Sequence, residues 1–316
     1  MSPENFFAQN SYSKKIDSNM IGTVLDGDFP ACSFTALGDV DYSGEHGALS
    51  YLKEKKYLSS LVSNPKISGV LCRQEDVHEI PDSLISLVVD DPNYSFFTLV
   101  DHCGGEYLSG IKSLIPSEHP VDRLRGVSQT GVYLGEGVLL EPNVTIHPGT
   151  YISDNVKIRA GAVLGLDTFQ HQRTTKGIVS PKHDGYLIVE EGVEVGACAT
   201  VSKGFSYRST RLKKGCRLDA HVYVGHGAQV GVGTFLCAGS RVMGHVDIGE
   251  EVFIGPNAIV SSRCVIGDRA KVSLGSVVTK SVPESATVTG NFAIPHDQFI
   301  SNLKGQLKSG GSSNES

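Results

Sequence analysis

From residue 132 onward, apolar and polar positions recur with a six-residue period. Leu, Ile or Val occupies the third place of every hexad, and Gly or Asn often stands near its end. This period fits neither an α-helix nor a single strand, so each hexad predicts a short strand followed by a turn. The aliphatic phase covers 21 positions in three blocks: Leu134, Leu140, Ile146, Ile152, Ile158, Leu164; Val189, Val195, Val201; and Leu212, Leu218, Val224, Val230, Leu236, Val242, Ile248, Ile254, Val260, Ile266, Val272, Val278.

Such a repeat predicts a mainly β protein built as a parallel β-helix. Three hexads form one triangular coil, the aliphatic residue points into the prism, and Gly or Asn supplies the positive φ at the corners. At three hexads per coil, the 21 hexads predict about seven coils. With strands roughly 4.8 Å apart, the prism is on the order of 30 Å tall.

Two breaks interrupt the register. Leu164 and Val189 lie 25 residues apart, one more than four hexads, and Val201 and Leu212 lie 11 apart, one fewer than two. The first break contains GLDTFQHQRTTKGIVSPKHDGY and the second contains KGFSYRST. Insertions in solenoids commonly build a binding face, so we expect one here; the alternative for the first break is a flexible surface loop.

Residues 1–115 show no hexads and predict an α/β domain. ALSYLKEKKYLSSLVS has helical spacing, ISGVLC and SLISLVVDD predict strands, and NYSFFTLVDHC predicts a helix. The β-helix then occupies 116–290, and 291–316 holds a short C-terminal helix, DQFISNLKGQLK, before a disordered SGGSSNES tail. We expect this helix and the N-terminal domain to cap the open ends of the prism.

Composition and charge limit the possible partners and the cellular compartment. A net charge of −6 and a pI near 6.0 argue against nucleic acid or an anionic membrane as a partner. The seven cysteines never approach CxxC spacing, which fits packing residues in a reduced compartment. The first residues lack a signal peptide, and no segment has the 18 apolar residues of a membrane span. We expect a soluble cytoplasmic protein.

The order of these parts and several motifs resemble one family. ALSYLKEKKYL and VVDDPNYSFF in the first domain, and GLDTFQ, PKHDGYLIVEEGVEVGACATVSKG and RLDAHVYVGHGAQVG in the repeat, are similar to the UDP-3-O-acylglucosamine N-acyltransferases of lipid A synthesis. These belong to the hexapeptide-repeat acyltransferases. The resemblance implies a left-handed β-helix and a homotrimer with active sites at subunit contacts.

The resemblance also assigns site residues. Thioester aminolysis needs a base for the amine proton and donors for the developing oxyanion. His226, in VGHG, stands at the position of the family's base, and Gly244, in VMGH, at its backbone oxyanion donor. His221 and His245 are expected at other corners of the stack, lining the site or contacting another subunit. His183, in the first break, is either a substrate contact or structural.

Departures from the family concentrate at ligand-facing positions. Arg263 replaces a second active-site histidine; it cannot act as a base, so it either binds phosphate or carboxylate or pairs with Asp or Glu between subunits. In the nucleotide segment Tyr51 replaces a stacking Phe, Tyr57 matches, and Glu54 replaces Asn, unless it faces solvent. Thr168 and Gln170 replace two glycines of the motif that GLDTFQ resembles.

These departures favour an N-acyltransferase acting on a dTDP- or UDP-linked amino sugar for surface polysaccharide. The donor is acyl-CoA or an acyl carrier protein, with no tightly bound cofactor. The alternative is the lipid A enzyme itself, which uses acyl carrier protein. A basic cluster is either a site for that acidic carrier or a solvated face: Arg208, Arg211, Lys213, Lys214 and Arg217.

Two other classes share the prism. A γ-type carbonic anhydrase needs three histidines converging on a metal, and no third histidine stands at the spacing that would join His221 and His226, so no metal site is expected. A purely structural prism would not need the nucleotide-type N-terminal domain. Acyl transfer is therefore the favoured interpretation.

Overall fold

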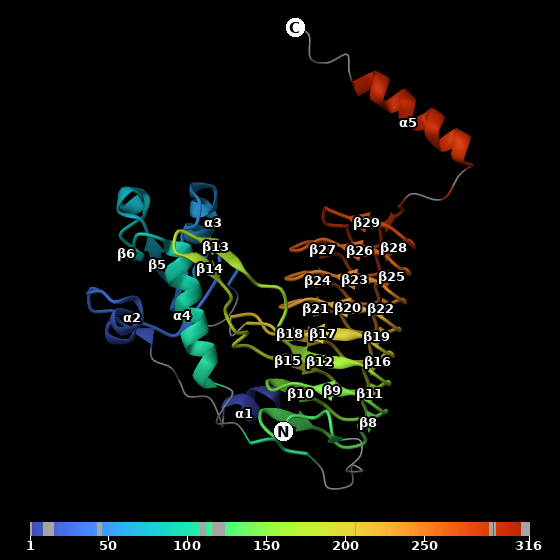
Figure 1. Ribbon diagram of the computed structural model, residues 1–316, viewed down its shortest axis with the longest axis horizontal. Helices are drawn as coiled ribbons and strands as arrows, with labels where there is room; N and C mark the ends of the chain where they lie inside the picture. Colours follow the sequence, from blue (N-terminus) through green and yellow to red (C-terminus); the bar gives the residue numbers. More distant parts are fainter. Residues whose placement is uncertain are drawn as a thin grey trace.

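The computed structural model describes residues 2–8, 16–42, 46–107, 112–115, 124–205, 207–290, 293 and 295–310. A tall prism of stacked coils forms one half of the molecule, and an α/β domain lies beside it (Figure 1).

Three parallel sheets form the faces of the prism, and each coil contributes one strand to each sheet. The first sheet contains β7 (Val132–Leu134), β10 (Thr150–Ile152), β15 (Leu187–Val189), β18 (Thr210–Leu212), β21 (Gln229–Val230), β24 (Asp247–Ile248) and β27 (Val265–Ile266). The second contains β8 (Leu139–Leu140), β11 (Lys157–Ile158), β16 (Glu194–Val195), β19 (Arg217–Leu218), β22 (Phe235–Leu236), β25 (Phe253–Ile254), β28 (Lys271–Val272) and β30 (Thr287–Val288). The third contains β9 (Thr145–Ile146), β12 (Val163–Leu166), β17 (Thr200–Ser202), β20 (Tyr223–Val224), β23 (Arg241–Val242), β26 (Ile259–Val260) and β29 (Val277–Val278).

The predicted parallel β-helix is confirmed. All of the aliphatic phase positions belong to one continuous buried core along the prism axis. Parallel pairing in constant register, such as Val224 beside Val242 and Val242 beside Val260, stacks like residues on like. Burial of this column of branched side chains is the main favourable term for the fold. The hexads end at Val278, but β30 adds one more strand to the second sheet.

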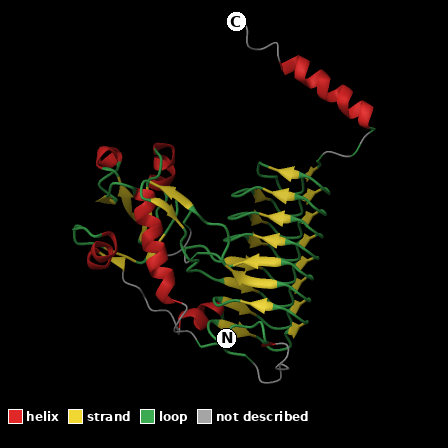
Figure 2. Cartoon of the chain, viewed as in Figure 1, coloured by secondary structure: helices red, strands yellow, loops and turns green. Residues whose placement is uncertain are grey.

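A four-stranded parallel sheet forms the N-terminal domain (Figure 2). Its strands are β3 (Ala36–Leu37), β4 (Ala48–Tyr51), β5 (Ile67–Cys72) and β6 (Ile85–Val88), joined by the short helices α3 (Leu58–Ser63), η1 (Lys55–Tyr57) and η2 (Gln74–Glu79). Helices α2 (Ser18–Leu25) and α4 (Pro92–Tyr107) pack together, and β1 (Ile16–Asp17) pairs antiparallel with β2 (Ser33–Phe34). The predictions for β5, β6 and α4 are confirmed.

The prediction of one helix over residues 48–63 is wrong. Residues 48–51 form β4, and helical structure begins only at Lys55. Pairing of Tyr51 with Leu71 of β5 places Ala48 and Leu49 in the domain core. Sheet pairing and burial therefore override the local helical spacing.

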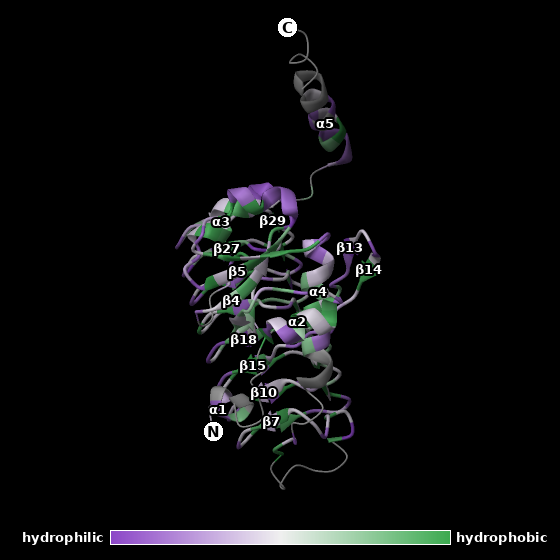
Figure 3. Ribbon diagram, turned by 90° about the vertical axis from the view of Figure 1, so that its left-hand side faces the viewer, coloured by the Kyte–Doolittle hydropathy of each residue, from purple (hydrophilic) through white to green (hydrophobic). Residues whose placement is uncertain are grey.

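The expectation that the prism ends are capped is also wrong. The N-terminal domain lies along the side of the prism (Figures 1 and 3), and α5 (His296–Gly310) extends away from the last coil. Instead, α1 (Pro3–Ala8) packs on the first coils, where Phe6 contacts the rings of Tyr133 and Tyr151. The 311–316 part of the tail lies outside the described residues. No described helix is long and apolar enough to cross a membrane.

Both register breaks join the two domains. The first contains a hairpin, β13 (Gln172–Thr174) and β14 (Gly177–Val179), which lies against α4; the Thr175 N–H donates to Asp91 Oδ2 at 2.7 Å. The second break carries Phe205 and Tyr207 into the core of the N-terminal domain. The first break is thus an ordered hairpin rather than a loose surface loop.

Candidate functional site

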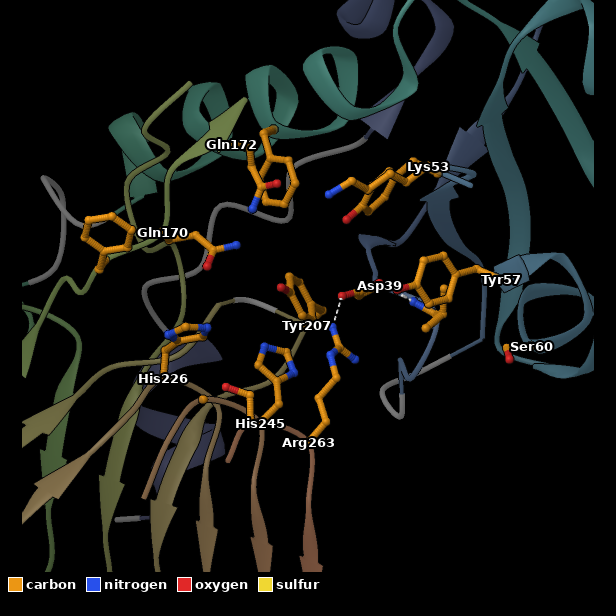
Figure 4. A pocket seen from close by; sticks show the side chains of 16 residues that line it. Asp39, Lys53, Tyr57, Ser60, Gln170, Gln172, Tyr207, His226, His245 and Arg263 are labelled. Atoms are coloured by element: carbon orange, nitrogen blue, oxygen red, sulfur yellow. Dashed lines mark hydrogen bonds and ion pairs between the residues drawn. The ribbon is translucent and has the colours of Figure 1, made fainter. Parts of the chain in front are cut away.

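A cavity of about 540 Å³ lies where the prism, the N-terminal domain and the first break meet. His226, His245 and Arg263 rise from one corner of the prism, Lys53, Tyr57 and Asp39 face them from the N-terminal domain, and Gln170 and Gln172 come from the break (Figure 4). Residues distant in sequence therefore share one enclosed space.

The prism wall consists of two columns at the corner between the third and first sheets. His226, Gly244 and Ser262 occupy one column, and all three line the cavity. The neighbouring column contains Gly227, His245 and Arg263, with φ of 68°, 59° and 65°. The same left-handed φ recurs at other corners of the prism, such as Asn257 and the exposed His221, so here it reflects the turn of each coil.

These columns correct one expectation. His245 does not lie at another corner from His226, because it follows that residue by one coil plus one position and so belongs to the same corner. His221 does stand at a different corner, between the second and third sheets, where it is exposed. The structure therefore does not bring His221 into the cavity.

His226 stands beside a free backbone donor. A Cβ built on Gly244 would lie 2.8 Å from His226 Nε2, so that nitrogen borders Gly244 directly. Among the described residues, nothing accepts a hydrogen bond from the Gly244 N–H. Gly225, below it, leaves room for this amide, since a Cβ there would come within 2.7 Å of Gly244 N. The expected base and the expected oxyanion donor are thus adjacent.

The electrostatic environment keeps His226 neutral. Burial, followed by the charges of His245, His183 and Arg263, lowers the pKa of His226 to about 3. A neutral imidazole has a lone pair available to take a proton. An anionic ligand in the cavity would oppose this shift and strengthen the base.

His183 lies behind His226 rather than in the cavity. Its side chain is 1% exposed, and its ring stacks on Phe205 with centroids 4.4 Å apart. Toward the site it contacts the Thr168 hydroxyl, at 3.1 Å, and the His226 ring, with centroids 5.6 Å apart. The structure therefore gives His183 no direct access to a substrate.

Arg263 joins the two domains of one chain. Its guanidinium donates to Asp39 Oδ2 at 2.6 Å (Figure 4) and to Asp41 Oδ2 at 2.8 Å. Burial alone would raise the pKa of Asp41, but the interaction with His245 and the charge of Arg263 outweigh it and lower this pKa to about 2. Of the roles expected for Arg263, pairing with aspartates is observed, but within the chain.

The aromatic residues of the nucleotide segment reach the cavity. Tyr51 lines it and stacks on Phe96 with ring centroids 4.3 Å apart, and Tyr57 lies near its rim. Glu54 is exposed and pairs with Lys56 at 2.7 Å, outside the cavity lining. The structure thus assigns Glu54 the solvent-facing alternative.

Lys53 and Asp39 line the site but were missed from the sequence. Among the described residues, none forms an ion pair with Lys53, whereas Lys55 and Lys56 pair with Glu79 and Glu54. Lys53 carried no clear signal, because it lies in a bend two residues beyond the end of β4, in a segment whose spacing predicted a helix. Asp39 carried no signal either, since its role depends on the packing of two domains.

The basic cluster is largely neutralised by the chain itself. Arg208 pairs with Asp247, Arg211 with Glu190 and Lys214 with Glu191. This favours the solvated face over a carrier-binding site. Among the described residues, no group of three or more His, Cys, Asp or Glu side chains is arranged to hold a metal ion.

Replacing Gly244 with alanine is expected to displace the His226 ring. The new Cβ would lie 2.8 Å from Nε2 and Cε1, and misplacing a catalytic group by a fraction of an ångström costs about tenfold to a hundredfold in rate. Steady-state turnover measures the effect. Gly305→Ala, in α5 with open space around its Cβ position, is the matched control; equal rates in both variants would contradict the placement of His226.

Stability is expected to fall on the acid side of neutrality. Burial lowers the pKa of both His226 and His183, so below about pH 6.5 the unfolded chain binds protons that the folded chain does not. The contribution of these two histidines to the free energy of unfolding is complete above that pH and declines as the pH falls. Urea unfolding at about pH 7.5 and about pH 5 tests this. A His183→Gln variant should lose less free energy of unfolding between these two pH values than the wild type. An equal loss in both proteins would contradict the contribution of His183.

Comparisons with known proteins agree with this architecture. The family model described as bacterial transferase hexapeptide (six repeats) matches residues 131–165 and 245–280. The UDP-3-O-acylglucosamine N-acyltransferase of Campylobacter lari is 30% identical over 287 residues, covering 82% of this chain and 86% of that protein. The protein of the same name from Wolinella succinogenes is 29% identical over 174 residues, and the alignment spans 54% of each.

Among solved structures, the chain is similar to the Francisella novicida UDP-N-acetylglucosamine acyltransferase. It is 21% identical, with a TM-score of 0.47, and the match covers 56% of this chain and 64% of that one. The sequence relationship to the Campylobacter lari protein is the closer evidence, because it extends through both the N-terminal domain and the prism. The chain belongs to the UDP-3-O-acylglucosamine N-acyltransferase family, whose members are acyltransferases.

Proposed function

We propose that the protein transfers an acyl group from a thioester to the amine of UDP-3-O-acylglucosamine. The observation that carries this proposal is the pairing of His226 with the free Gly244 N–H in a cavity that also contains Tyr51, Tyr57 and Lys53. The names of the relatives favour this acceptor. They support the lipid A alternative over a dTDP-linked sugar for surface polysaccharide.

The chemistry follows from the positions of these groups. The amine nitrogen of the sugar attacks the thioester carbonyl carbon while His226 Nε2 takes its proton. The Gly244 N–H donates to the carbonyl oxygen as it becomes negative. When the C–S bond breaks, the leaving thiolate takes the proton back from His226. Amide and free thiol are the products, and His226 returns to its neutral form.

The N-terminal domain supplies the groups for the nucleotide. Tyr51 and Tyr57 offer aromatic faces for a pyrimidine. The ammonium of Lys53 points into the cavity (Figure 4) and balances the charge of a diphosphate. Arg263 is held by Asp39 and Asp41, so Lys53 is the cation that remains for this task among the described residues lining the cavity.

The proposal also covers the acyl donor, the oligomeric state and the cellular location. We assign acyl carrier protein as the donor, in keeping with the lipid A reaction, and acyl-CoA is the alternative. A homotrimer and a cytoplasmic location are likewise proposed.

A thermal-shift panel tests the acceptor and the donor separately. Ligands that bind the folded state raise its melting temperature. UDP-3-O-acylglucosamine is expected to stabilise the protein more than UDP alone, and a dTDP-linked amino sugar less. Stabilisation by the dTDP sugar alone would overturn the choice of acceptor, and stabilisation by CoA but not by acyl carrier protein would overturn the choice of donor.

Lys53→Gln is expected to weaken binding of the UDP-linked acceptor without changing the rate of the acyl-transfer step. Loss of one charge-assisted contact to phosphate raises KM for the UDP-linked sugar by about tenfold and leaves kcat nearly constant. Lys66→Gln, a lysine outside the cavity lining, is the control. An unchanged KM in Lys53→Gln would remove Lys53 from the nucleotide site.

A further inference from the structure

The Thr168 hydroxyl bridges the buried His183 and the half-buried His226. Its Oγ1 lies 3.0 Å from His226 Nδ1 and 3.1 Å from His183 Nε2. GLDTFQ places this hydroxyl where the related motif has glycine, which carries none. The rings of His183 and His226 also meet edge to face, with centroids 5.6 Å apart, but among the described residues this oxygen is what links them by hydrogen bonds. The direction of each hydrogen bond decides which nitrogens carry protons.

One backbone donor fixes that direction. The Thr168 N–H donates to His183 Nε2 at 3.4 Å. Because a neutral imidazole nitrogen that accepts a hydrogen bond carries no proton, the proton of neutral His183 lies on Nδ1. The contact between Thr168 Oγ1 and the same Nε2 then requires the hydroxyl to donate to it.

The rest of the chain of hydrogen bonds follows. Having donated its only proton to His183, the Thr168 oxygen accepts from His226, so the proton of neutral His226 lies on Nδ1. The lone pair of His226 is then on Nε2, the nitrogen beside Gly244. We propose that Thr168 and His183 are positioning residues that hold His226 in the tautomer a general base requires. The proposal rests on the proposed function for its catalytic meaning.

The surroundings keep this arrangement in place. Phe205 stacks on the His183 ring. Asp167 Oδ1, which pairs with Lys203 at 3.0 Å, lies 3.9 Å from His183 Nδ1; this is too far for a hydrogen bond, and among the described residues Nδ1 has no hydrogen-bond partner, so the carboxylate favours a proton there through its charge alone. When His226 takes the amine proton on Nε2, its Nδ1–H continues to donate to Thr168. No proton has to move through Thr168 or His183 during the reaction, so their role is orientation alone.

The isosteric variant Thr168→Val tests the hydroxyl. It removes the acceptor of the His226 Nδ1–H, which favours the opposite tautomer. We expect kcat to fall about 10- to 100-fold with KM nearly constant, and Thr168→Ser to retain activity within about threefold of wild type. Equal kcat in the Val and Ser variants would overturn the proposal, and thermal melting confirms that both are folded.

Ring nitrogen-15 NMR of the wild-type protein near neutral pH provides a readout independent of turnover. The His226 signals, assigned by their loss in His226→Gln, should show a protonated Nδ1 and an unprotonated Nε2, and Thr168→Val should shift this balance. A wild-type His226 protonated mainly on Nε2 would overturn the proposal. The expected tautomer in a protein that acylates no amino sugar would support the positioning role and reject the proposed function, so the two are separable.

Discussion

Replacing His226 with alanine is expected to lower kcat about 10²- to 10⁴-fold, the usual contribution of a general base, while the protein remains folded. The imidazole points into the cavity and contributes nothing to the aliphatic column inside the prism. His245 also lines the cavity, but its Nδ1 faces Asp41 at 3.6 Å, and Arg263 is permanently charged and paired with Asp39. His226 is therefore the group we expect to act as the base. Thiol release from the acyl donor, measured at saturating acceptor, gives kcat directly.

His221→Ala is the matched control for this change. It removes the same side chain from an exposed corner of the same coil, outside the cavity, and is expected to retain nearly full activity. Near-normal turnover in His226→Ala would rule out the base. Similar losses in both variants would point to a general effect of corner histidines on the fold.

Phe205→Ala is expected to cost about 3–5 kcal/mol in the free energy of unfolding, as for other large-to-small changes at buried aromatic residues. Phe205 is 1% exposed, belongs to the core of the N-terminal domain although it comes from the prism, and stacks on both His183 and Tyr207. Its loss leaves a cavity where the two domains meet and frees the His183 ring. Urea unfolding measures the stability, and kcat should fall as well.

Phe299→Ala provides the comparison, because Phe299 is 52% exposed in α5 and its removal should change stability by less than about 0.5 kcal/mol. If Phe205→Ala changed the free energy of unfolding equally little, packing of the second register break would not be what holds the two domains together.

The prism could be predicted from sequence because its rules are local. Each hexad specifies its own strand and turn, and stacking repeats that pattern, so phase positions such as Val224 and Val242 identify the core without knowledge of any distant contact. The roles of His226 and Gly244 came from the family resemblance and stay predictions; the structure shows only that the two residues lie together on one corner of the prism.

What could not be predicted depends on contacts between distant segments. The hexad pattern says nothing of where the N-terminal domain lies, so the pairing of Arg263 with Asp39 and the burial of Phe205 in the other domain had no local signal. Tyr51 was placed in a helix because its spacing is helical, yet pairing with β5 makes it a strand residue. His183 was a candidate substrate contact, and only the position of Thr168 shows that it lies behind the base.

The most direct test of the proposed activity is the product itself. The purified protein is incubated with UDP-3-O-acylglucosamine and an acyl carrier protein charged with a fatty acyl chain, and the nucleotide sugar is analysed by mass spectrometry. The account predicts a gain of one acyl group on the sugar amine, one free thiol per amide formed, and loss of both in His226→Ala. Unchanged acceptor with the wild-type protein, or equal product from His226→Ala, would contradict it.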